Sequence, residues 1–166
     1  MSQINLLDLI CEKVKNLKAY QVETVEEGIK LHANENPYPP SPELKNLIRA
    51  HLENLDLNRY PDPDCKRLKE AISSRLGVPG NQLVIGNGSD ELIQHLMQVF
   101  CDDGDTVAFP EPTFAMYSIL AKGMGLKTQT FELDGKWDFK AESTIEKLTS
   151  GHTRIVFISY PNNPTG

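Results

Sequence analysis

Apolar positions recur at helical spacing near the start of the chain. Residues 4–18 place an apolar side chain every three or four positions, which predicts an amphipathic helical arm. Residues 29–33 predict a short strand. Residues 34–40 contain three prolines, and proline lacks the N–H donor that helices and sheets need, so we expect a loop there.

Two helices are expected next. Ser41 followed by Pro42 is typical of a helix start, and the residues that share one face after it are Leu44, Leu47, Ile48, His51 and Leu52. A second helix is expected to begin at Asp62-Pro63 and to stop at Gly77. The residues that this second helix is expected to bury are Leu68, Ala71, Ile72 and Leu76.

From residue 83 onward, strand and helix patterns alternate. The predicted strands are 83–85, 106–109, 126–133 and 154–159, and the predicted helices are 90–101, 113–122 and 141–149. Such alternation predicts a three-layer α/β fold, in which helices cover both faces of a mostly parallel sheet. Residues 154–159 are almost continuously apolar, as expected of a buried central strand. Such a strand should lead into a further helix, so we expect the sequence to be truncated.

Composition and charge limit the function. The chain has 166 residues, of which 39% are hydrophobic and 24% charged, as in soluble globular proteins, and its net charge is -6. A net negative charge does not attract nucleic acids or anionic membranes, so small molecules are the expected partners. We find no membrane-spanning run and no secretory signal. Three cysteines without C-x-x-C pairing predict free thiols in the cytoplasm, and scattered histidines predict no metal site.

One glycine-rich turn has the pattern of an anion site. In Gly86-Asn-Gly-Ser-Asp-Glu91 a predicted strand runs into a helix whose expected N-cap is Ser89. The first N–H groups of a helix have no internal acceptor, and the helix dipole favours negative charge, so a phosphate suits this place. An ordinary capped helix start explains the same residues equally well.

Other candidate residues also allow two interpretations, a ligand-binding role and a purely structural one. Asn162 and Asn163 follow the last predicted strand, where α/β sheets bind ligands, but Asn, Pro and Gly also form ordinary turns. Phe114 and Tyr117 either stack on a flat ligand or pack in the core. The turn around Arg59 and Tyr60 offers a cation and a phenol, or simply introduces a helix.

Read together, these segments resemble one family. Their order along the chain is Asn34-Glu-Asn-Pro37, Arg59-Tyr-Pro-Asp-Pro63, Gly86-Asn-Gly-Ser-Asp-Glu91, Pro112-Thr-Phe-Ala-Met-Tyr117 and Pro161-Asn-Asn-Pro-Thr-Gly166. From about residue 20 to 166 the chain resembles the N-terminal part of histidinol-phosphate aminotransferases, which are pyridoxal-phosphate enzymes of fold type I. The Asn-Asn-Pro-Thr-Gly segment is shared by many aminotransferases, and the other motifs narrow the resemblance to this branch.

The resemblance implies roles for individual residues. The implied cofactor is pyridoxal 5'-phosphate. Ser89 and Asp90 would hold its phosphate. Its ring would stack on Phe114, and its phenolic oxygen would accept a hydrogen bond from Asn163. Tyr60 would reach the cofactor phosphate of a neighbouring subunit, which implies a homodimer. The residues that would line the substrate pocket are Tyr20 and Asn34, with Glu35 a weaker candidate.

The implied reaction transfers an amino group from L-histidinol phosphate to 2-oxoglutarate. It requires a lysine that forms a Schiff base with the cofactor, and no lysine of this chain matches that position, so the chain alone is expected to be inactive. The resemblance also implies an N-terminal arm and small-domain segment over 1–42, and an incomplete large domain over 43–166. Two alternatives stay open: another aminotransferase or decarboxylase of fold type I, acting on an aromatic or phosphorylated amino acid, and a non-catalytic phosphate-binding domain.

Overall fold

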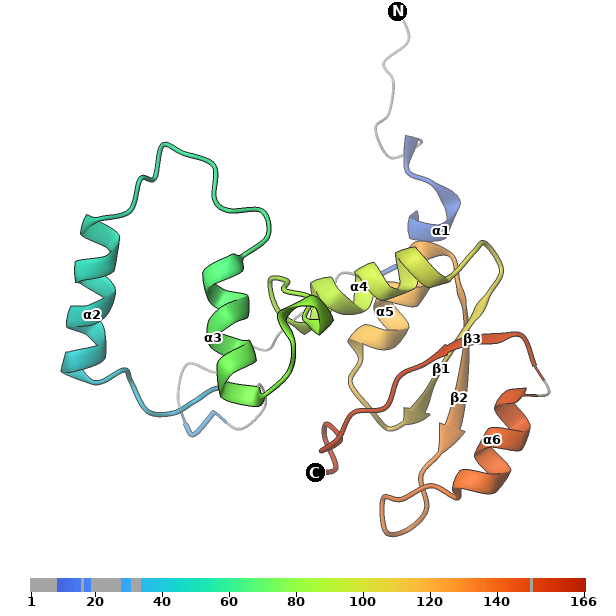
Figure 1. Ribbon diagram of the computed structural model, residues 1–166. Helices are drawn as coiled ribbons and strands as arrows, with labels where there is room; N and C mark the ends of the chain where they lie inside the picture. The colour runs from blue at the N-terminus through green and yellow to red at the C-terminus, as the bar shows by residue number, and fades with distance from the viewer. Residues whose placement is uncertain (1–8, 16, 19–27, 31–33, 150) are drawn as a thin grey trace, which may run out of the picture. The chain divides into compact units, whose positions relative to one another are not determined.

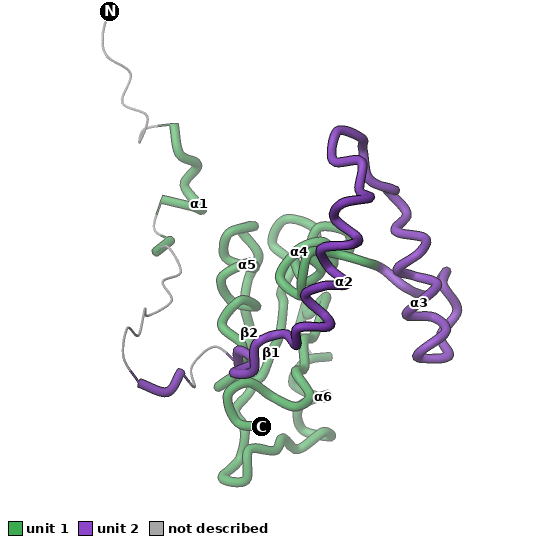
Figure 2. The backbone as a smooth tube through the Cα atoms, turned by 90° about the vertical axis from the view of Figure 1, so that its left-hand side faces the viewer, with its two compact units in different colours: residues 1–19, 85–166 green, residues 20–84 purple. Residues whose placement is uncertain are grey.

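The chain contains two compact units. The computed structural model describes residues 9–15, 17–18, 28–30, 34–149 and 151–166. One unit comprises residues 1–19 and 85–166, and the other residues 20–84 (Figure 2). This division follows contacts within the chain and differs from the predicted domain boundary after residue 42, which stays a prediction.

A three-stranded parallel sheet forms the centre of the first unit. Its strands are β1 (Thr106–Glu111), β2 (Lys127–Glu132) and β3 (Thr153–Val156), in the order β2-β1-β3. Strand β1 pairs Phe109 with Thr130 of β2 and Ala108 with Val156 of β3. Because β1 has a neighbour on each side, four of its six residues are buried.

Helices cover both faces of this sheet, as predicted. Helices α4 (Ser89–Phe100) and α5 (Met116–Met124) lie on one side and α6 (Ala141–Thr149) on the other (Figure 1). The core between the sheet and the α4 and α5 helices consists of Ile93, Met97, Val107, Phe109, Tyr117, Ala121 and Leu126. On the other face Phe131 is buried, with its ring edge-on to Phe139 at 5.6 Å between centroids.

Among the residues described, the second unit holds two α-helices, one short 3-10 helix and no buried residue. Helix α2 (Pro42–Glu53) starts as predicted, with the Ser41 Oγ accepting a hydrogen bond from the Leu44 N–H at 3.2 Å. Helix α3 (Lys66–Leu76) ends at Gly77, whose φ of 68° is easy only for glycine. The loop 34–40 contains no helix or strand, as predicted.

Several expected elements differ from the structure. Residues 83–85 form no strand and follow a short 3-10 helix, η2 (Gly80–Gln82). Helix α3 starts at Lys66 rather than at Asp62-Pro63, and none of its residues is buried, because the described residues of this unit form no sheet for it to cover. Strand β3 is shorter than predicted and only alternately half-buried, because within the described residues it pairs on one side only.

The N-terminal predictions are only partly covered. Of the expected arm over residues 4–18, the described part contains one short helix, α1 (Glu12–Lys15), whose Lys13 Nζ donates to the Met124 carbonyl at the end of α5 at 3.4 Å. Ile29 and Lys30 belong to no strand, and residues 31–33 lie outside the described residues.

Candidate functional site

Two turns at the carboxyl edge of the sheet are joined by one asparagine. Strands β1 and β3 are parallel neighbours, so the chain leaves both at the same edge. The Asn162 Nδ2 donates to the Pro112 carbonyl at 3.0 Å, and the Thr113 Oγ1 donates to the Asn162 Oδ1 at 2.7 Å. The turn after β1 and the turn after β3 therefore form one connected surface.

The start of α4 lies at this same edge. The Arg154 Nε, early in β3, donates to the carbonyl of Phe100, the last residue of α4, at 2.7 Å. Helix α4 therefore ends where β3 begins and runs opposite to the strand, as Figure 1 shows. Its first residues, Ser89 and Asp90, consequently lie toward the edge where β1 and β3 end.

The glycine turn before α4 has the geometry of an anion site, with one correction to the predicted cap. Gly88, with a φ of 88°, is the N-cap, and Ser89 is already the first helical residue. The Glu91 carboxylate turns back to accept a hydrogen bond from the Asn87 N–H. The N–H groups of Ser89 and Asp90 belong to the first helical turn, where the helix supplies no acceptor.

Gly86 lies close to side chains of the first turn of α4. A Cβ at this position would lie 2.7 Å from the Leu92 Cδ2 and 3.0 Å from the Glu91 carboxylate. Both atoms are side-chain atoms of the first turn of α4, so a larger residue would have to push these two side chains aside. A glycine here lets the backbone pass close to the helix, which is the property that a phosphate cradle needs.

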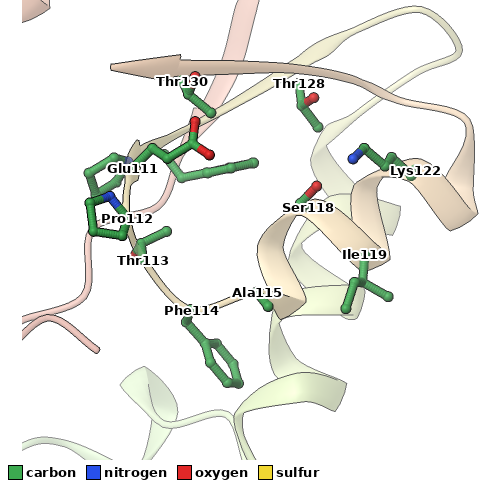
Figure 3. Close-up of a pocket in the computed structure, with 12 residues that line it drawn as sticks. Glu111, Pro112, Thr113, Phe114, Ala115, Ser118, Ile119, Lys122, Thr128 and Thr130 are labelled. Carbon is green, nitrogen blue, oxygen red and sulfur yellow. The ribbon is translucent and has the colours of Figure 1, made fainter. Parts of the chain in front are cut away.

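The two aromatic candidates have different environments. Tyr117 is buried, its ring stacks on Phe157 at 4.9 Å, and its hydroxyl shares a hydrogen bond with the Ser159 Oγ at 2.8 Å. Tyr117 is therefore a core residue. Phe114 is half-buried, edge-on to Tyr117 at 5.7 Å, and in Figure 3 its ring points away from the Glu111 and Lys122 side chains.

The neighbouring asparagines also differ. Asn163 is exposed, and no hydrogen bond of its side chain is found among the described residues. Asn162 makes the two bonds across the turns and a third to the Thr165 Oγ1 at 2.8 Å. No sequence pattern divides these roles between Asn162 and Asn163, although Thr113, just after β1, signals a hydrogen-bond partner for one of the two amides.

The remaining candidates, Tyr20, Asn34 and Tyr60, belong to the second unit. Tyr60 is fully exposed, and Asn34 is exposed with a φ of 53°. Tyr20 lies outside the described residues. The candidates that share the carboxyl edge of the sheet are therefore Ser89, Asp90, Phe114 and Asn163. The structure does not place the other candidates at this edge.

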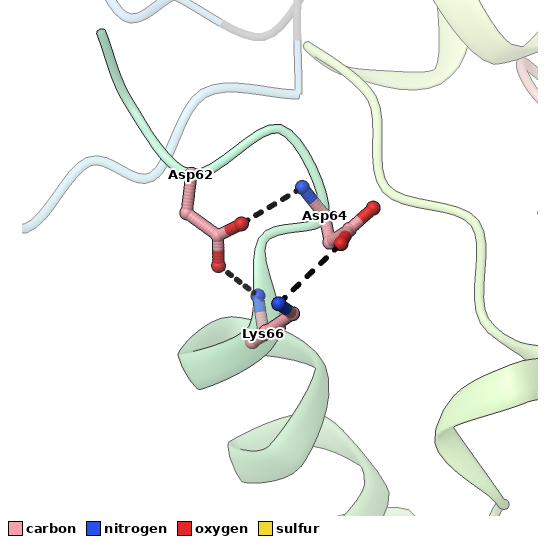
Figure 4. Close-up of polar contacts among 3 residues, drawn as sticks. All are labelled: Asp62, Asp64 and Lys66. Atoms are coloured by element: carbon pink, nitrogen blue, oxygen red, sulfur yellow. Dashed lines mark hydrogen bonds and ion pairs between the residues drawn. The ribbon is translucent and has the colours of Figure 1, made fainter.

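The loop that carries Tyr60 leads into a polar start of α3. The Asp62 carboxylate accepts hydrogen bonds from the Lys66 N–H at 2.9 Å and the Asp64 N–H at 3.0 Å (Figure 4). These two bonds, with smaller contributions from the positive charges of Lys66 and Lys69, hold the Asp62 pKa below its ordinary 3.8. Asp62 thus stabilises the helix start as a carboxylate.

The structure offers no second centre of chemistry within its described residues. The three cysteines are free thiols there, and burial, followed by the nearby Asp105 charge, raises the pKa of Cys101. No group of three possible metal ligands gathers among these residues. None of the described helices combines the length and apolarity needed to cross a membrane.

The fold is that of the α/β domain found in pyridoxal-phosphate enzymes of fold type I. The family model for aminotransferase class I and II matches residues 26–166, and the chain belongs to this family. It is 36% identical over 159 residues to a histidinol-phosphate aminotransferase of Caldanaerobacter subterraneus subsp. tengcongensis, covering 96% of this chain and 45% of that relative. The chain thus spans less than half the length of this relative.

Solved structures share the fold. A histidinol-phosphate aminotransferase of Sinorhizobium meliloti, in complex with pyridoxal 5'-phosphate, matches with a TM-score of 0.72 and 23% identity, covering 80% of this chain and 35% of that one. An aspartate aminotransferase of Thermotoga maritima matches with a TM-score of 0.71 and 28% identity, covering 85% of this chain and 40% of that one. The predicted α/β class and the predicted family resemblance are both confirmed.

Proposed function

We propose that the carboxyl edge of this sheet forms part of a pyridoxal 5'-phosphate site. The observation that carries the proposal is the arrangement of three segments at one edge: the start of α4, the turn after β1 and the turn after β3. The residues present fit the cofactor, because a Cβ at Gly86 would crowd the Leu92 and Glu91 side chains at the start of α4, where the first N–H groups have no acceptor within the helix.

Each residue has a defined task in this proposal. The N–H groups of Ser89 and Asp90 bind the phosphate, and the partly exposed ring of Phe114 stacks on the pyridine ring. The exposed Asn163 amide donates a hydrogen bond to the phenolic oxygen. When bound, the cofactor supplies an electron sink for bonds at the substrate carbon. The Asn162 bonds keep the turns of Phe114 and Asn163 in a fixed relation.

We further propose that the protein to which this chain belongs transfers an amino group from L-histidinol phosphate to 2-oxoglutarate. Support comes from the relatives named for that activity and from the motifs around Asn34, Tyr60 and Ser89. In this proposal Tyr60 reaches the cofactor phosphate of a second subunit, and Tyr20 and Asn34 line the substrate pocket. Residues 1–42 belong to the arm and small domain, and residues 43–166 to the large domain.

The 166 residues alone are expected to be inactive, because none of their lysines corresponds to the catalytic lysine of the family. The test adds pyridoxal 5'-phosphate and borohydride to the isolated chain and measures both covalent labelling and amino transfer. We expect neither a labelled lysine nor turnover. Stable labelling of one lysine together with turnover would show that the catalytic lysine lies within this chain.

Substrate choice is tested on the longer protein, with the length of its relatives. We expect amino transfer from L-histidinol phosphate to exceed transfer from phenylalanine and aspartate. The likeness to an aspartate aminotransferase at 28% identity favours one competing proposal, an aminotransferase of the same fold with another amino donor. Preference for aspartate or phenylalanine in this comparison would establish that alternative.

A further inference from the structure

The Phe114 ring, which we assign to the cofactor, belongs to a connected set of aromatic rings. Phe114 is half-buried, and its ring is perpendicular to that of Tyr117, at 89° between planes and 5.7 Å between centroids. Tyr117 is buried and lies against two further rings, Phe157 at 4.9 Å and Phe109 at 6.0 Å. Phe114 thus contacts a buried ring and still keeps part of its own surface accessible to a ligand.

The contact with Tyr117 limits the orientations open to Phe114. A phenylalanine on an open turn exchanges among rotamers, and ordering it when a ligand binds costs conformational entropy. A perpendicular aromatic pair is favourable beyond its buried area, so Tyr117 favours one of these rotamers before a ligand arrives. The Tyr117 N–H also donates to the Phe114 carbonyl at 3.3 Å, which fixes the backbone between the two rings. The ring of Tyr117 therefore orients the ring of Phe114.

The hydroxyl of Tyr117 reaches the other side of the proposed site, where it shares a hydrogen bond of 2.8 Å with the Ser159 Oγ. Ser159 lies four residues before Asn163. Two residues before Ser159, the Phe157 N–H donates to the Ala108 carbonyl of β1 at 2.8 Å. The segment that leads to Asn163 is therefore tied to the sheet at Phe157 and to α5 at Ser159. One side chain contacts both the stacking ring and this segment.

We propose that Tyr117 is a positioning residue for bound pyridoxal 5'-phosphate. This role rests on the cofactor site proposed above, and it gives that site a buried residue that acts through two others. The Tyr117 ring sets the angle at which Phe114 meets the pyridine ring, and the Tyr117 hydroxyl sets the place from which Asn163 donates to the phenolic oxygen. The phosphate is held at the start of α4, so Tyr117 takes no part in holding it.

The test measures binding of pyridoxine 5'-phosphate to the full chain by ligand-detected NMR. This ligand has the ring, the phenolic oxygen and the phosphate of the cofactor, but it has no aldehyde and so forms no Schiff base with surface lysines. Tyr117→Leu removes both the aromatic contact and the hydroxyl, and we expect binding to weaken about two- to tenfold. Binding of methyl phosphate, which needs only the start of α4, should stay unchanged.

Two further variants isolate the hydroxyl. Tyr117→Phe keeps the ring, and Ser159→Ala removes the partner of the hydroxyl. Both should keep the stacking and weaken the hydrogen bond from Asn163, which stabilises the ionised phenol. The pKa of the phenol in bound pyridoxine 5'-phosphate, followed by its ultraviolet absorption, should therefore be higher in both variants than in the wild-type chain. An unchanged pKa in both, with folding confirmed by circular dichroism, would show that the hydroxyl positions nothing.

Phe131→Leu is the control for lost core packing. Phe131 is buried on the other face of the sheet, where its ring is edge-on to Phe139. The substitution should lower stability, as Tyr117→Leu does, but leave ligand binding unchanged. Wild-type affinity in Tyr117→Leu, or equal weakening in Phe131→Leu, would overturn the positioning role alone. Failure of the wild-type chain to bind pyridoxine 5'-phosphate would overturn the cofactor site itself, and this role with it.

Discussion

The Asn162 side chain donates to the carbonyl of Pro112 across 3.0 Å, linking residues 50 positions apart in the sequence. The Thr113 hydroxyl closes the same link from the other direction. Two neighbouring strands of a parallel sheet bring the turns together, but these bonds fix how the turns lie. This makes Asn162 a positioning residue for the exposed Asn163 beside it.

Substituting the two asparagines should separate stability from ligand binding. Asn162→Ala removes three hydrogen bonds and leaves the Pro112 carbonyl unpaired, so we expect a loss of about 1–3 kcal/mol in the free energy of unfolding. Asn163→Ala should leave stability unchanged, since the side chain is exposed, and should weaken binding of pyridoxal 5'-phosphate. Urea unfolding and a cofactor titration measure the two effects; equal loss of stability in both variants would contradict the division of roles.

The Tyr117–Ser159 hydrogen bond provides a second test of the same edge. Tyr117→Phe removes the hydroxyl but keeps the ring stacked on Phe157, so we expect a loss of about 0.5–1.5 kcal/mol in the free energy of unfolding. Ser159→Ala should cost a similar amount. In the double variant the two losses should not add, because both substitutions remove one bond. Full additivity in thermal or urea unfolding would mean that the two hydroxyls act separately.

Local patterns were enough to predict the core of the first unit. The pattern of apolar residues over 106–109 and 126–133 predicts two strands. Both strands are present, as β1 and β2. Ser41-Pro42 marks the start of α2 and Gly77 the end of α3, because the backbone conformations needed at these helix ends are ones that these residues favour. The Gly86–Ser89 turn was located correctly, although the cap moved from Ser89 to Gly88.

Features that depend on distant partners could not be predicted. Residues 83–85 have the composition of a strand, but a strand needs a neighbour to pair with, and no described strand pairs with them. Residues 154–159 look like a buried strand, yet burial depends on what lies on the unpaired side of β3. The separate roles of Asn162 and Asn163 depend on Thr113 and Pro112, which no local pattern connects to them.

The apolar face of α2, which no described residue covers, should make the isolated chain associate. Leu44, Leu47, Ile48 and Leu52 on this face, and Leu55 just after the helix, are all exposed, each by 48% or more. Light scattering should therefore show concentration-dependent assembly, and Leu47→Gln with Leu52→Gln should reduce it. Asn46→Gln, on the same helix but outside this apolar set, is the matched control. A monomeric wild-type chain would instead favour the alternative of a self-sufficient phosphate-binding domain.

The Asp62 carboxylate makes the start of α3 sensitive to acid. Its pKa in the folded chain is lowered by its bonds to the Lys66 and Asp64 N–H groups, so its stabilising contribution is present above the ordinary value of 3.8. That contribution is lost as pH falls through the lowered pKa, because the folded state then has to take up the proton. The stability advantage of the chain over an Asp62→Asn variant should therefore shrink in urea unfolding as pH falls below 3.8.

The exposed Asp103, in the other unit, supplies the control for this pH dependence. Asp103→Asn should show no comparable change in its stability difference from the wild-type chain. An Asp62→Asn difference that stays constant, or grows, as the solution becomes more acidic would show that the carboxylate does not stabilise α3 through its charge.

A methyl group at Gly86 tests whether the helix start serves as a phosphate cradle. In Gly86→Ala the new Cβ would lie 2.7 Å from the Leu92 Cδ2 and 2.9 Å from its Cγ, so the Leu92 side chain, in the first turn of α4, has to move. We expect a cost of about 1–3 kcal/mol in the free energy of unfolding, as for other overpacked sites. Gly135→Ala is the control, because nothing lies within 4 Å of a Cβ there.

The same substitution should also affect anion binding. The crowded Leu92 and Glu91 side chains belong to the helix turn whose Ser89 and Asp90 N–H groups we propose hold the phosphate, so pyridoxal 5'-phosphate should bind more weakly to Gly86→Ala. Pyridoxal without the phosphate should lose much less affinity, because it makes no use of those donors. If both compounds weaken equally, the start of α4 supports the fold without holding the phosphate, and the proposed cofactor site would have to be placed elsewhere.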